Sequence, residues 1–500
     1  MRHPNDWRRV AVFLAVLFSA PLLVAVAAAQ EAGAGRSPRF QGKLEPCDWP
    51  GYPERALCGR HEVYENRAAG SGRRLALQVV VLPATAVPAT DALTFLAGGG
   101  VLPATRMGPF FDRALTRLNQ DRDILLVDQR GTGRSGALEC EAPDWQAVLA
   151  GDRSRKDYMK ALRECRDVLG RYTDLSLYTT PNAADDLDEI RAWLGYETLT
   201  VWGASYGTKL ARVYARRHPA RVRAMALHGT VPLAFSMWPD LGPSGVRALA
   251  ALLDRCAADA SCKKVYPDSL EALEAVMGRL AEDPVDADRP RGELGPERVN
   301  NRVAASVIVG ALGSMRMARG IPLWIHAASQ GDDSYFVGLS ASGGPSEVPL
   351  GVYYSIACSE EYGRPGGVPA AQASDVPRGL DVFLEVSHLE RDREVCSFWP
   401  KASLPETFWA PVQSTVPTLF VTGANDFITP PEYAARIAEG FPNATQLVLR
   451  DRSHNDVDPC VVGIVERFLM DPGAETLDTS CVDETPAFRF ERPSRLRNSP

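Results

Sequence analysis

One serine lies in a sequence pattern that is typical of catalytic nucleophiles. Ser205 is the third residue of Gly203-Ala-Ser-Tyr-Gly207, between the apolar run 199–202 and a helix predicted from about Tyr206 to Arg217. A sharp strand–turn–helix of this kind lifts a serine hydroxyl above the edge of a sheet and requires small neighbours. A hydroxyl becomes a strong nucleophile only beside a base, so this serine predicts a histidine and a carboxylate elsewhere in the chain.

The base and the acid are predicted on two loops toward the C-terminal end. Asp426 follows the apolar run 416–422, and His454 follows the apolar run 445–450. In sites built on such a turn, the acid and then the histidine follow the serine along the chain, each after a later strand. Asp426 would hold the imidazole in the correct tautomer and stabilise the imidazolium. The expected catalytic triad is therefore Ser205, Asp426 and His454.

Other residues near this pattern remain alternatives. Asp456 and Asp458 are closer to His454 in sequence, but both follow it, whereas the expected order places the acid first. Asp426 could instead form an Asx turn ahead of the helix that follows it. Among the other histidines, His228 ends a predicted strand that has no catalytic place in this order. The order favours Asp426 and His454.

Two backbone N–H groups are expected to stabilise the negatively charged oxygen of the transition state. One belongs to Tyr206, directly after the serine, and the other to Gly99 in Ala97-Gly-Gly-Gly100, which follows the predicted strand 92–97. Glycine lets the backbone approach a substrate oxygen closely. The glycine run could also be a simple turn, whereas a phosphate-binding loop is excluded because no Lys-Ser/Thr follows.

The elements that must position these residues alternate between strands and helices. A helix is predicted over 180–194, and the apolar runs that predict strands are 75–82, 92–97, 123–128, 199–202, 223–228, 416–422 and 445–450. Such alternation is typical of an α/β fold with a doubly wound, mostly parallel sheet that is covered on both faces.

The alternation stops near Pro232 and resumes at Val416, with helix-like segments between Gly- and Pro-rich loops. We therefore expect a core in two parts, 41–231 and 412–483, interrupted by a mainly helical lid over 232–411. Residues 484–500 are expected to form a C-terminal tail.

The first 29 residues have the pattern of a secretory signal peptide. Arg2, Arg8 and Arg9 precede an apolar run that ends in small residues, with cleavage expected after Ala29. An uncleaved membrane anchor is the alternative because the run is long enough to span a bilayer, but Pro21 within it favours cleavage. The mature chain is expected to be soluble and secreted or periplasmic, with no stable membrane anchor.

The ten cysteines fit an exported protein. An even number of cysteines in such a chain predicts disulfides, although sequence alone leaves their pairing open. The nearest-neighbour solution is Cys47–Cys58, Cys140–Cys165, Cys256–Cys262, Cys358–Cys396 and Cys460–Cys481. No closely spaced metal-binding motif occurs, so no metal site is predicted.

Charge and composition exclude several classes. The 55 basic and 62 acidic residues give a net charge of −7, which argues against nucleic acid as the main partner. A hydrophobic content of 45% and a charged content of 23% are typical of globular proteins and exclude a disordered or fibrous chain. The absence of internal sequence repeats excludes solenoids and propellers.

Five stretches together resemble the α/β-hydrolases of the proline iminopeptidase and tripeptidyl aminopeptidase group, in its exported, disulfide-bearing branch. The segment near the C-terminus is like that of tripeptidyl aminopeptidases. The matching stretches are LAGGG (96–100), DILLVDQRGTGRSG (123–136), VWGASYGTKLARVYARRHPARV (201–222), GANDFITPPEYA (423–434) and RSHNDVDPC (452–460). The resemblance implies the α/β-hydrolase fold, the same three triad residues and release of N-terminal residues from peptides. The family's usual His-Gly-Gly-Pro-Gly is Ala97-Gly-Gly-Gly-Val101 here, which keeps the backbone donor.

The expected function is that of an exported serine hydrolase, an aminopeptidase that needs neither metal nor cofactor. A carboxylesterase or lipase on the same triad is the alternative, and a non-catalytic binding protein on this scaffold is a third. An aminopeptidase needs acidic groups for the substrate ammonium, and Glu360 and Glu361 are candidates, although they could form a solvated turn beside a disulfide. The substrate is expected to be a peptide or an ester, and its length and the oligomeric state are not predicted.

Overall fold

The computed structural model describes residues 38–50, 56–86, 89, 91–107, 115, 117–288, 295–341, 349–369, 380–386, 389–484 and 486–493. The expected signal peptide and residues 494–500 of the expected tail lie outside the described residues.

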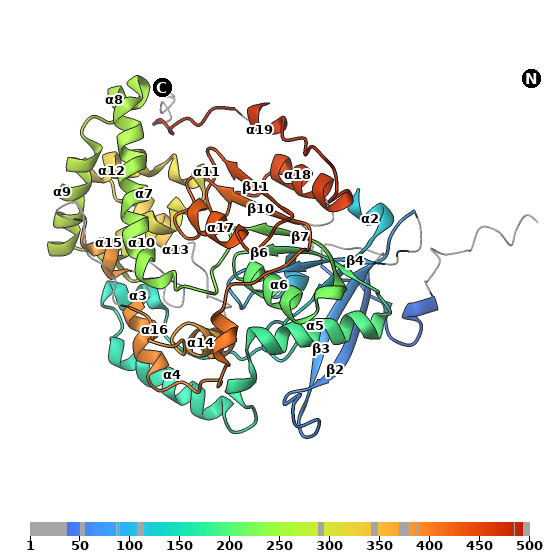
Figure 1. Ribbon diagram of the computed structural model, residues 1–500. Helices are drawn as coiled ribbons and strands as arrows, with labels where there is room; N and C mark the ends of the chain where they lie inside the picture. Colours follow the sequence, from blue (N-terminus) through green and yellow to red (C-terminus); the bar gives the residue numbers. More distant parts are fainter. Residues whose placement is uncertain are drawn as a thin grey trace, which may run out of the picture.

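A nine-stranded sheet forms the centre of the molecule, in the order β1-β2-β3-β5-β4-β6-β7-β10-β11 (Figure 1). The strands are β1 (Glu45–Pro46), β2 (Leu57–Tyr64), β3 (Arg74–Leu82), β4 (Ala92–Leu96), β5 (Asp123–Val127), β6 (Leu199–Ala204), β7 (Val222–His228), β10 (Thr418–Gly423) and β11 (Ala444–Leu449). The pairs from β5 to β11 are parallel, whereas β1, β2 and β3 pair antiparallel at one edge. The prediction of a mostly parallel sheet is confirmed.

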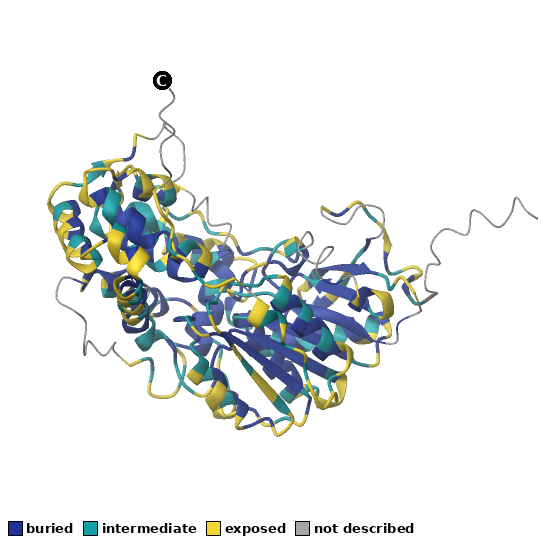
Figure 2. Ribbon diagram, turned by 90° about the horizontal axis from the view of Figure 1, so that it is seen from above, coloured by how far each residue is buried: buried dark blue, intermediate teal, exposed yellow. Residues whose placement is uncertain are grey.

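Helices cover both faces of this sheet. On one face α5 (Thr180–Leu194) and α6 (Tyr206–Arg217) share a hydrophobic cluster with Val79 and Val81 of β3. On the other face α18 (Pro459–Met470) shares a cluster with the alternate residues of that strand. Because successive side chains of a strand point to opposite faces, the apolar strands contribute to both clusters, and Figure 2 shows them buried. Other core helices are α2 (Leu118–Asp121), α3 (Trp145–Ala150), α4 (Arg155–Leu169), α17 (Pro431–Ala438) and α19 (Cys481–Glu484).

Between β7 and β10 lies the helical insertion that the sequence predicted. Its helices are α7 (Trp238–Ala258), α8 (Ala260–Val265), α9 (Ser269–Glu282), α10 (Asn301–Leu312), α11 (Met315–Ala318), α12 (Ile321–Ser329), α13 (Ser334–Ala341), α14 (Leu350–Glu360), α15 (Val382–Glu385) and α16 (Leu389–Cys396), with a short ribbon of β8 (Val285–Asp286) and β9 (Arg298–Val299). In Figure 1, α7 to α13 gather at the side of the molecule away from β2 and β3.

The insertion is divided between two hydrophobic clusters. Side chains of α7, α9, α10 and α12 form a cluster of their own, which also takes in Leu149 and Ala150 of α3. Side chains of α14 and α16, in contrast, join the cluster of α5 and α6 on the sheet. The segment that the sequence predicts as a separate lid therefore shares hydrophobic clusters with core helices: its first helices pack with α3, and α14 and α16 pack with α5 and α6.

Residues 486–493, which follow α19, contact the insertion. The backbone N–H of Glu491 donates to the carbonyl of Arg319, and its own carbonyl accepts from the Tyr266 hydroxyl. The Phe488 ring lies 4.3 Å below the guanidinium of Arg255 on α7. These contacts connect the segment after α19, which follows the second part of the core, to the helical insertion.

All ten cysteines form disulfides, in the five nearest-neighbour pairs named above. Cys256–Cys262 and Cys358–Cys396 lie within the insertion, and the other three lie within the core.

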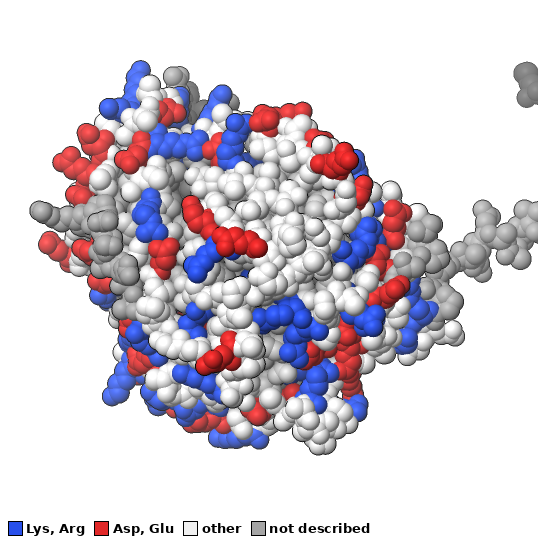
Figure 3. All heavy atoms as spheres, viewed as in Figure 1, with Lys and Arg blue, Asp and Glu red and all other residues white. Residues whose placement is uncertain are grey.

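Among the described residues, no helix is long and apolar enough to cross a membrane. Basic and acidic side chains are interspersed over the face that Figure 3 shows.

Candidate active site

Ser205 occupies a strained turn between β6 and α6. Its backbone has φ 51° and ψ −121°, a conformation that residues other than glycine rarely adopt. A Cβ atom at Gly203 would lie 2.6 Å from the carbonyl oxygen of Gly207, and one at Gly207 would collide with the carbonyl oxygen of Leu96. Both glycines are therefore required by the close approach of neighbouring backbone.

Hydrogen bonds from neighbouring elements hold this turn in place. The N–H of Ser205 donates to the carbonyl of His228 at the end of β7, at 2.8 Å. The carbonyl of Ser205 accepts from the N–H and the hydroxyl of Thr208, at 2.9 and 2.6 Å. Such contacts stabilise a backbone conformation that would be unfavourable on its own.

His454 and Asp426 are hydrogen-bonded to each other. Nδ1 of His454 lies 2.9 Å from Oδ2 of Asp426 and 3.0 Å from the hydroxyl oxygen of Thr429. The carboxylate of Asp426 also accepts from the N–H groups of Ile428 and Thr429 and from the Thr429 hydroxyl. Burial would raise the pKa of Asp426, but the neighbouring His454 and these hydrogen bonds outweigh it and lower that pKa. Asp426 is therefore an ionised, firmly oriented partner for the imidazole.

The two alternative acids have other partners. Asp456 accepts from the Ser314 hydroxyl and from the N–H of Met315, both in the insertion. Asp458 pairs with Arg452 and accepts from the first turn of α18. The structure thus brings Asp426, and not Asp456 or Asp458, to the His454 ring.

The end of β7 links Ser205 to His454. Gly229 follows His228, whose carbonyl holds the Ser205 N–H, and a Cβ atom at Gly229 would lie 2.9 Å from Cε1 of His454. The His454 imidazole therefore packs on the backbone of Gly229, and the preceding residue, His228, holds the Ser205 turn through its carbonyl. The sequence analysis gave His228 and Gly229 no role, although a glycine directly after an apolar strand is a signal of close backbone approach.

The glycine run after β4 lies against Ser205. A Cβ atom at Gly98 would lie 3.2 Å from Cβ of Ser205, while Gly99 and Gly100 adopt φ values of +70° and +72°. Gly99 and Tyr206, the two expected oxyanion donors, line the same cavity as Ser205.

That cavity has a volume of about 450 Å³ and a mostly apolar wall. Helices of the insertion supply much of this wall, with Trp238 and Leu241 from α7, Val309 from α10, Ile356 from α14 and Phe383 from α15. Phe427, Ile428 and Asn455, the sequence neighbours of Asp426 and His454, line it as well. Ser205 and the loops that carry Asp426 and His454 thus line one mostly apolar cavity.

The polar end of the cavity holds Lys209 and Glu361, which form an ion pair at 2.5 Å. Arg364 lies 3.7 Å from the other oxygen of Glu361. Glu360 does not line the cavity: it is fully buried and accepts from the N–H and hydroxyl of Thr180. Of the two glutamates expected to bind an amine, the structure therefore brings only Glu361 to the cavity.

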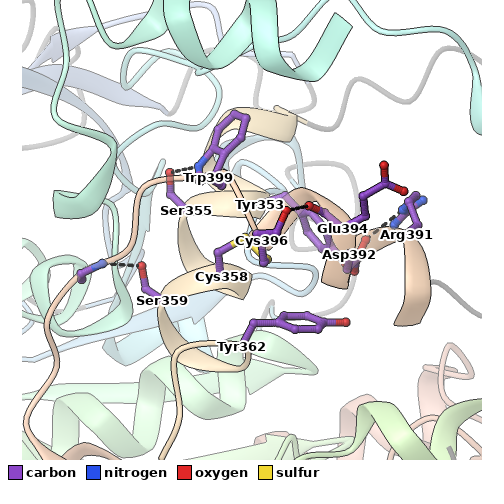
Figure 4. Close-up of a disulfide and its surroundings, with 12 residues drawn as sticks. Tyr353, Ser355, Cys358, Ser359, Tyr362, Arg391, Asp392, Glu394, Cys396 and Trp399 are labelled. Carbon is purple, nitrogen blue, oxygen red and sulfur yellow. Dashed lines mark hydrogen bonds and ion pairs between the residues drawn. A yellow bond between two sulfur atoms is a disulfide. The ribbon is translucent and has the colours of Figure 1, made fainter. Parts of the chain in front are cut away.

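Helix α14, which contributes to the cavity wall, is attached to α16 (Figure 4). The disulfide Cys358–Cys396 joins the two helices, and the hydroxyl of Tyr353 donates to Asp392 at 2.6 Å. Burial raises the pKa of Tyr353, which keeps this hydroxyl protonated as a donor. Tyr353 lines the cavity, so these contacts between α14 and α16 hold one part of the cavity wall in place.

Nothing in the described part of the chain gathers three or more side chains that could hold a metal ion. The chemistry that the arrangement supports is nucleophilic attack by a serine that a histidine–carboxylate pair assists.

Comparison with known proteins places this geometry in context. The family model described as alpha/beta hydrolase fold matches residues 96–458. Serine protease Hip1 of Mycobacterium tuberculosis is 27% identical over 493 residues, covering 87% of this chain and 91% of that protein. Tripeptidyl aminopeptidase of Streptomyces coelicolor is 26% identical over 409 residues, covering 72% of this chain and 70% of its own.

Two further similarities concern proline iminopeptidases. A probable proline iminopeptidase of Streptomyces coelicolor is 30% identical over 201 residues, covering 38% of this chain and 48% of its own. The crystal structure of the proline iminopeptidase of Mycobacterium smegmatis aligns with a TM-score of 0.37 at 17% identity, covering 83% of this chain and 98% of that one.

Proposed function

The chain belongs to the alpha/beta hydrolase family, and from this premise we propose that it is an exported serine aminopeptidase that releases N-terminal residues or short peptides. The observation that carries the proposal is the hydrogen-bonded Asp426–His454 pair beside the strained Ser205 turn, which lines a mostly apolar cavity. The relatives named serine protease, tripeptidyl aminopeptidase and proline iminopeptidase favour peptide substrates.

In the proposed mechanism the Ser205 hydroxyl attacks the scissile carbonyl while Nε2 of His454 takes its proton. Asp426 stabilises the imidazolium that forms, and the N–H groups of Gly99 and Tyr206 bind the oxyanion. His454 then gives the proton to the leaving amine, which leaves an acyl group on Ser205. A water molecule, activated by the same histidine, releases the acyl group and restores the enzyme.

Glu361 is the residue we assign to the substrate ammonium. It is the carboxylate on the cavity, and desolvating an unpaired ammonium in an apolar chamber would be costly. Its present partner is Lys209, so a bound ammonium would compete with that lysine for the carboxylate. Glu360 supports this end of the site through Thr180 and does not touch the substrate.

A carboxylesterase is the second candidate, and one observation favours it. The carboxylates of Glu360 and Glu361 face the cations of Lys209 and Arg364, so the polar end of the cavity has no excess negative charge. An uncharged acyl group would enter such a chamber without rearranging an ion pair.

Export and the lid are part of the proposal. Removal of residues 1–29 in an oxidising compartment is supported by the five disulfides and can be checked by sequencing the mature N-terminus. The insertion, 232–411, acts as the lid that encloses the acyl portion of the substrate.

The deciding experiment is a substrate panel. Free and N-acetylated aminoacyl and tripeptidyl amides are compared with simple esters, and the Ser205→Ala variant serves as the blank. The aminopeptidase proposal expects free-amine peptides to give the highest kcat/KM. Equal cleavage of acetylated and free peptides would leave the esterase candidate, and turnover by the Ser205→Ala variant would exclude both.

A further inference from the structure

The loop that carries His454 is hydrogen-bonded to the helical insertion. This loop is 452–458, the His454 loop. Its partner is 312–315, where α10 ends and α11 begins, the α10–α11 turn. Four hydrogen bonds cross between them: Ser453 hydroxyl to Leu312 carbonyl (2.6 Å), Asn455 N–H to Gly313 carbonyl (2.8 Å), Ser314 hydroxyl to Asp456 Oδ1 (2.6 Å) and Met315 N–H to Asp456 Oδ2 (2.8 Å).

Asp456 is the centre of this connection. The side chain of Ser314, at the N-terminus of α11, makes no capping hydrogen bond to its own helix, and Asp456 supplies an acceptor for that helix from outside. The same oxygen that accepts from Met315 also accepts from the N–H of Ser453, at 2.8 Å. One carboxylate thus ties the residue before His454 to the insertion.

The four contacts bracket His454 without touching its ring. Nδ1 of the ring faces Asp426 and Thr429, which both belong to the core. The residues held by the insertion are 453, 455 and 456, on either side of the histidine. Because these residues flank His454, their backbone contributes to the position of the imidazole, together with Asp426 and Thr429.

Asp456 does not line the Ser205 cavity. It lines a separate space of about 790 Å³ that is bounded by the α10–α11 turn and by residues 486–489. A change at Asp456 therefore removes no direct contact with substrate in the Ser205 cavity. Its effect can reach the reaction through the His454 loop or through Gly313 of the α10–α11 turn, which lines that cavity, and a probe too small to fill the cavity separates the two routes.

We propose that the α10–α11 turn positions the catalytic base, so that the insertion both encloses the substrate and sets the place of His454, with Asp456 as the positioning residue. The inference rests on the proposed role of His454 as the base. Displacing a reacting group by about 1 Å can cost about 100-fold in rate, so loss of these contacts has a measurable effect on the chemical step.

The test uses probes too small to depend on the lid. The full chain is assayed for p-nitrophenyl acetate hydrolysis and for the rate at which a small fluorophosphonate labels Ser205. Asp456→Ala removes all three hydrogen bonds of the carboxylate, whereas Asp456→Asn keeps an acceptor for Met315 and Ser453. The matched control is Tyr433→Phe, which breaks another contact between core and insertion, the 3.3 Å hydrogen bond to Asp240 on α7.

We expect Asp456→Ala to lower kcat and the labelling rate about 10- to 100-fold with KM changed less than about 3-fold, and Asp456→Asn to restore most of the loss. Tyr433→Phe is expected to be labelled at the wild-type rate. If Asp456→Ala does not fold, Ser314→Ala, which loses one hydrogen bond, replaces it with an expected loss of about 3- to 10-fold.

Three outcomes separate the possibilities. Labelling of Asp456→Ala at the wild-type rate, with only its melting temperature lowered, would show a merely structural contact and overturn the inference. An Asp456→Asn variant as slow as Asp456→Ala would point to the negative charge itself and overturn it as well. Failure of the wild-type protein to react with the fluorophosphonate would instead contradict the proposed function.

Discussion

The turn around Ser205 and the wall of the cavity beside it are built in different ways. The turn depends on residues 203–208 and on backbone of the adjacent strands β4 and β7. The wall combines α7, α10, α14 and α15 with the loops after β10 and β11, which lie far apart in the chain. The conformation of Ser205 is therefore specified locally, whereas the cavity beside it is specified by long-range packing.

The largest expected effect comes from the nucleophile itself. Ser205→Ala is expected to lower kcat about 10⁶-fold, because removing the serine of a triad costs about as much as removing the whole triad. The backbone of the turn is held by Thr208 and His228, which the substitution leaves in place. Thermal unfolding that matches wild type together with lost turnover and lost fluorophosphonate labelling would bear this out. Retention of labelling would place the nucleophile elsewhere.

This difference explains how much of the molecule could be predicted from the sequence. The parallel strands and α5 and α6 could be predicted, because apolar runs, caps and glycines act within a few residues of each other. The strand β2, which lies next to the short edge strand β1, was missed, since its Arg60, His61 and Glu62 give it no apolar run. The disulfide pairs follow short separations in the chain.

The positions of the two glutamates could not be predicted. Glu360 meets Thr180, and Glu361 meets Lys209, each more than 150 residues away in the chain. No pattern near residues 360–361 indicates which of them faces the cavity. The same holds for Asp456, whose partners in the α10–α11 turn precede it by more than 140 residues.

Asp426, the proposed acid of the triad, gives the second-largest expected effect. Asp426→Asn is expected to lower kcat about 10⁴-fold, because an amide can favour the wrong tautomer of the imidazole while leaving the geometry nearly intact. Steady-state kinetics with a free-amine peptide measures the loss, with Asp456→Asn as the control that keeps its contacts to the insertion. A large loss in the control with Asp426→Asn unaffected would move the acid to Asp456.

Glu361 tests the other side of the comparison, the cavity wall. Glu361→Gln is expected to lower kcat/KM for free-amine substrates about 10- to 100-fold, because a charge-assisted hydrogen bond to the ammonium is weakened, and to leave simple esters nearly unaffected. Glu360→Gln is the control, and we expect it to lower the melting temperature and to affect both substrate types alike. Equal losses on both substrate types for Glu361→Gln would assign Glu361 a supporting role in the ion pair with Lys209.

The smallest expected effect is a pH dependence of the free energy of unfolding that His228 causes. The carbonyl of this residue holds the Ser205 turn. Complete burial, with the nearby His454 adding to it, lowers the pKa of His228 to about 4. The unfolded chain binds a proton near pH 6.5, so the unfolded state holds more protons between these values and stability falls as the pH drops. The lowered pKa of Asp426 acts only at lower pH, because its contribution is fully present above the usual carboxyl range.

Between pH 7.5 and 5.5 the His228 contribution to the free energy of unfolding is expected to decrease by on the order of 1 kcal/mol. Urea unfolding of wild type and of His228→Asn at both pH values isolates it, since other groups titrate alike in the two proteins. An equal pH dependence in both proteins would mean that the pKa of His228 is the same in the folded and unfolded states, so that burial does not keep this histidine neutral.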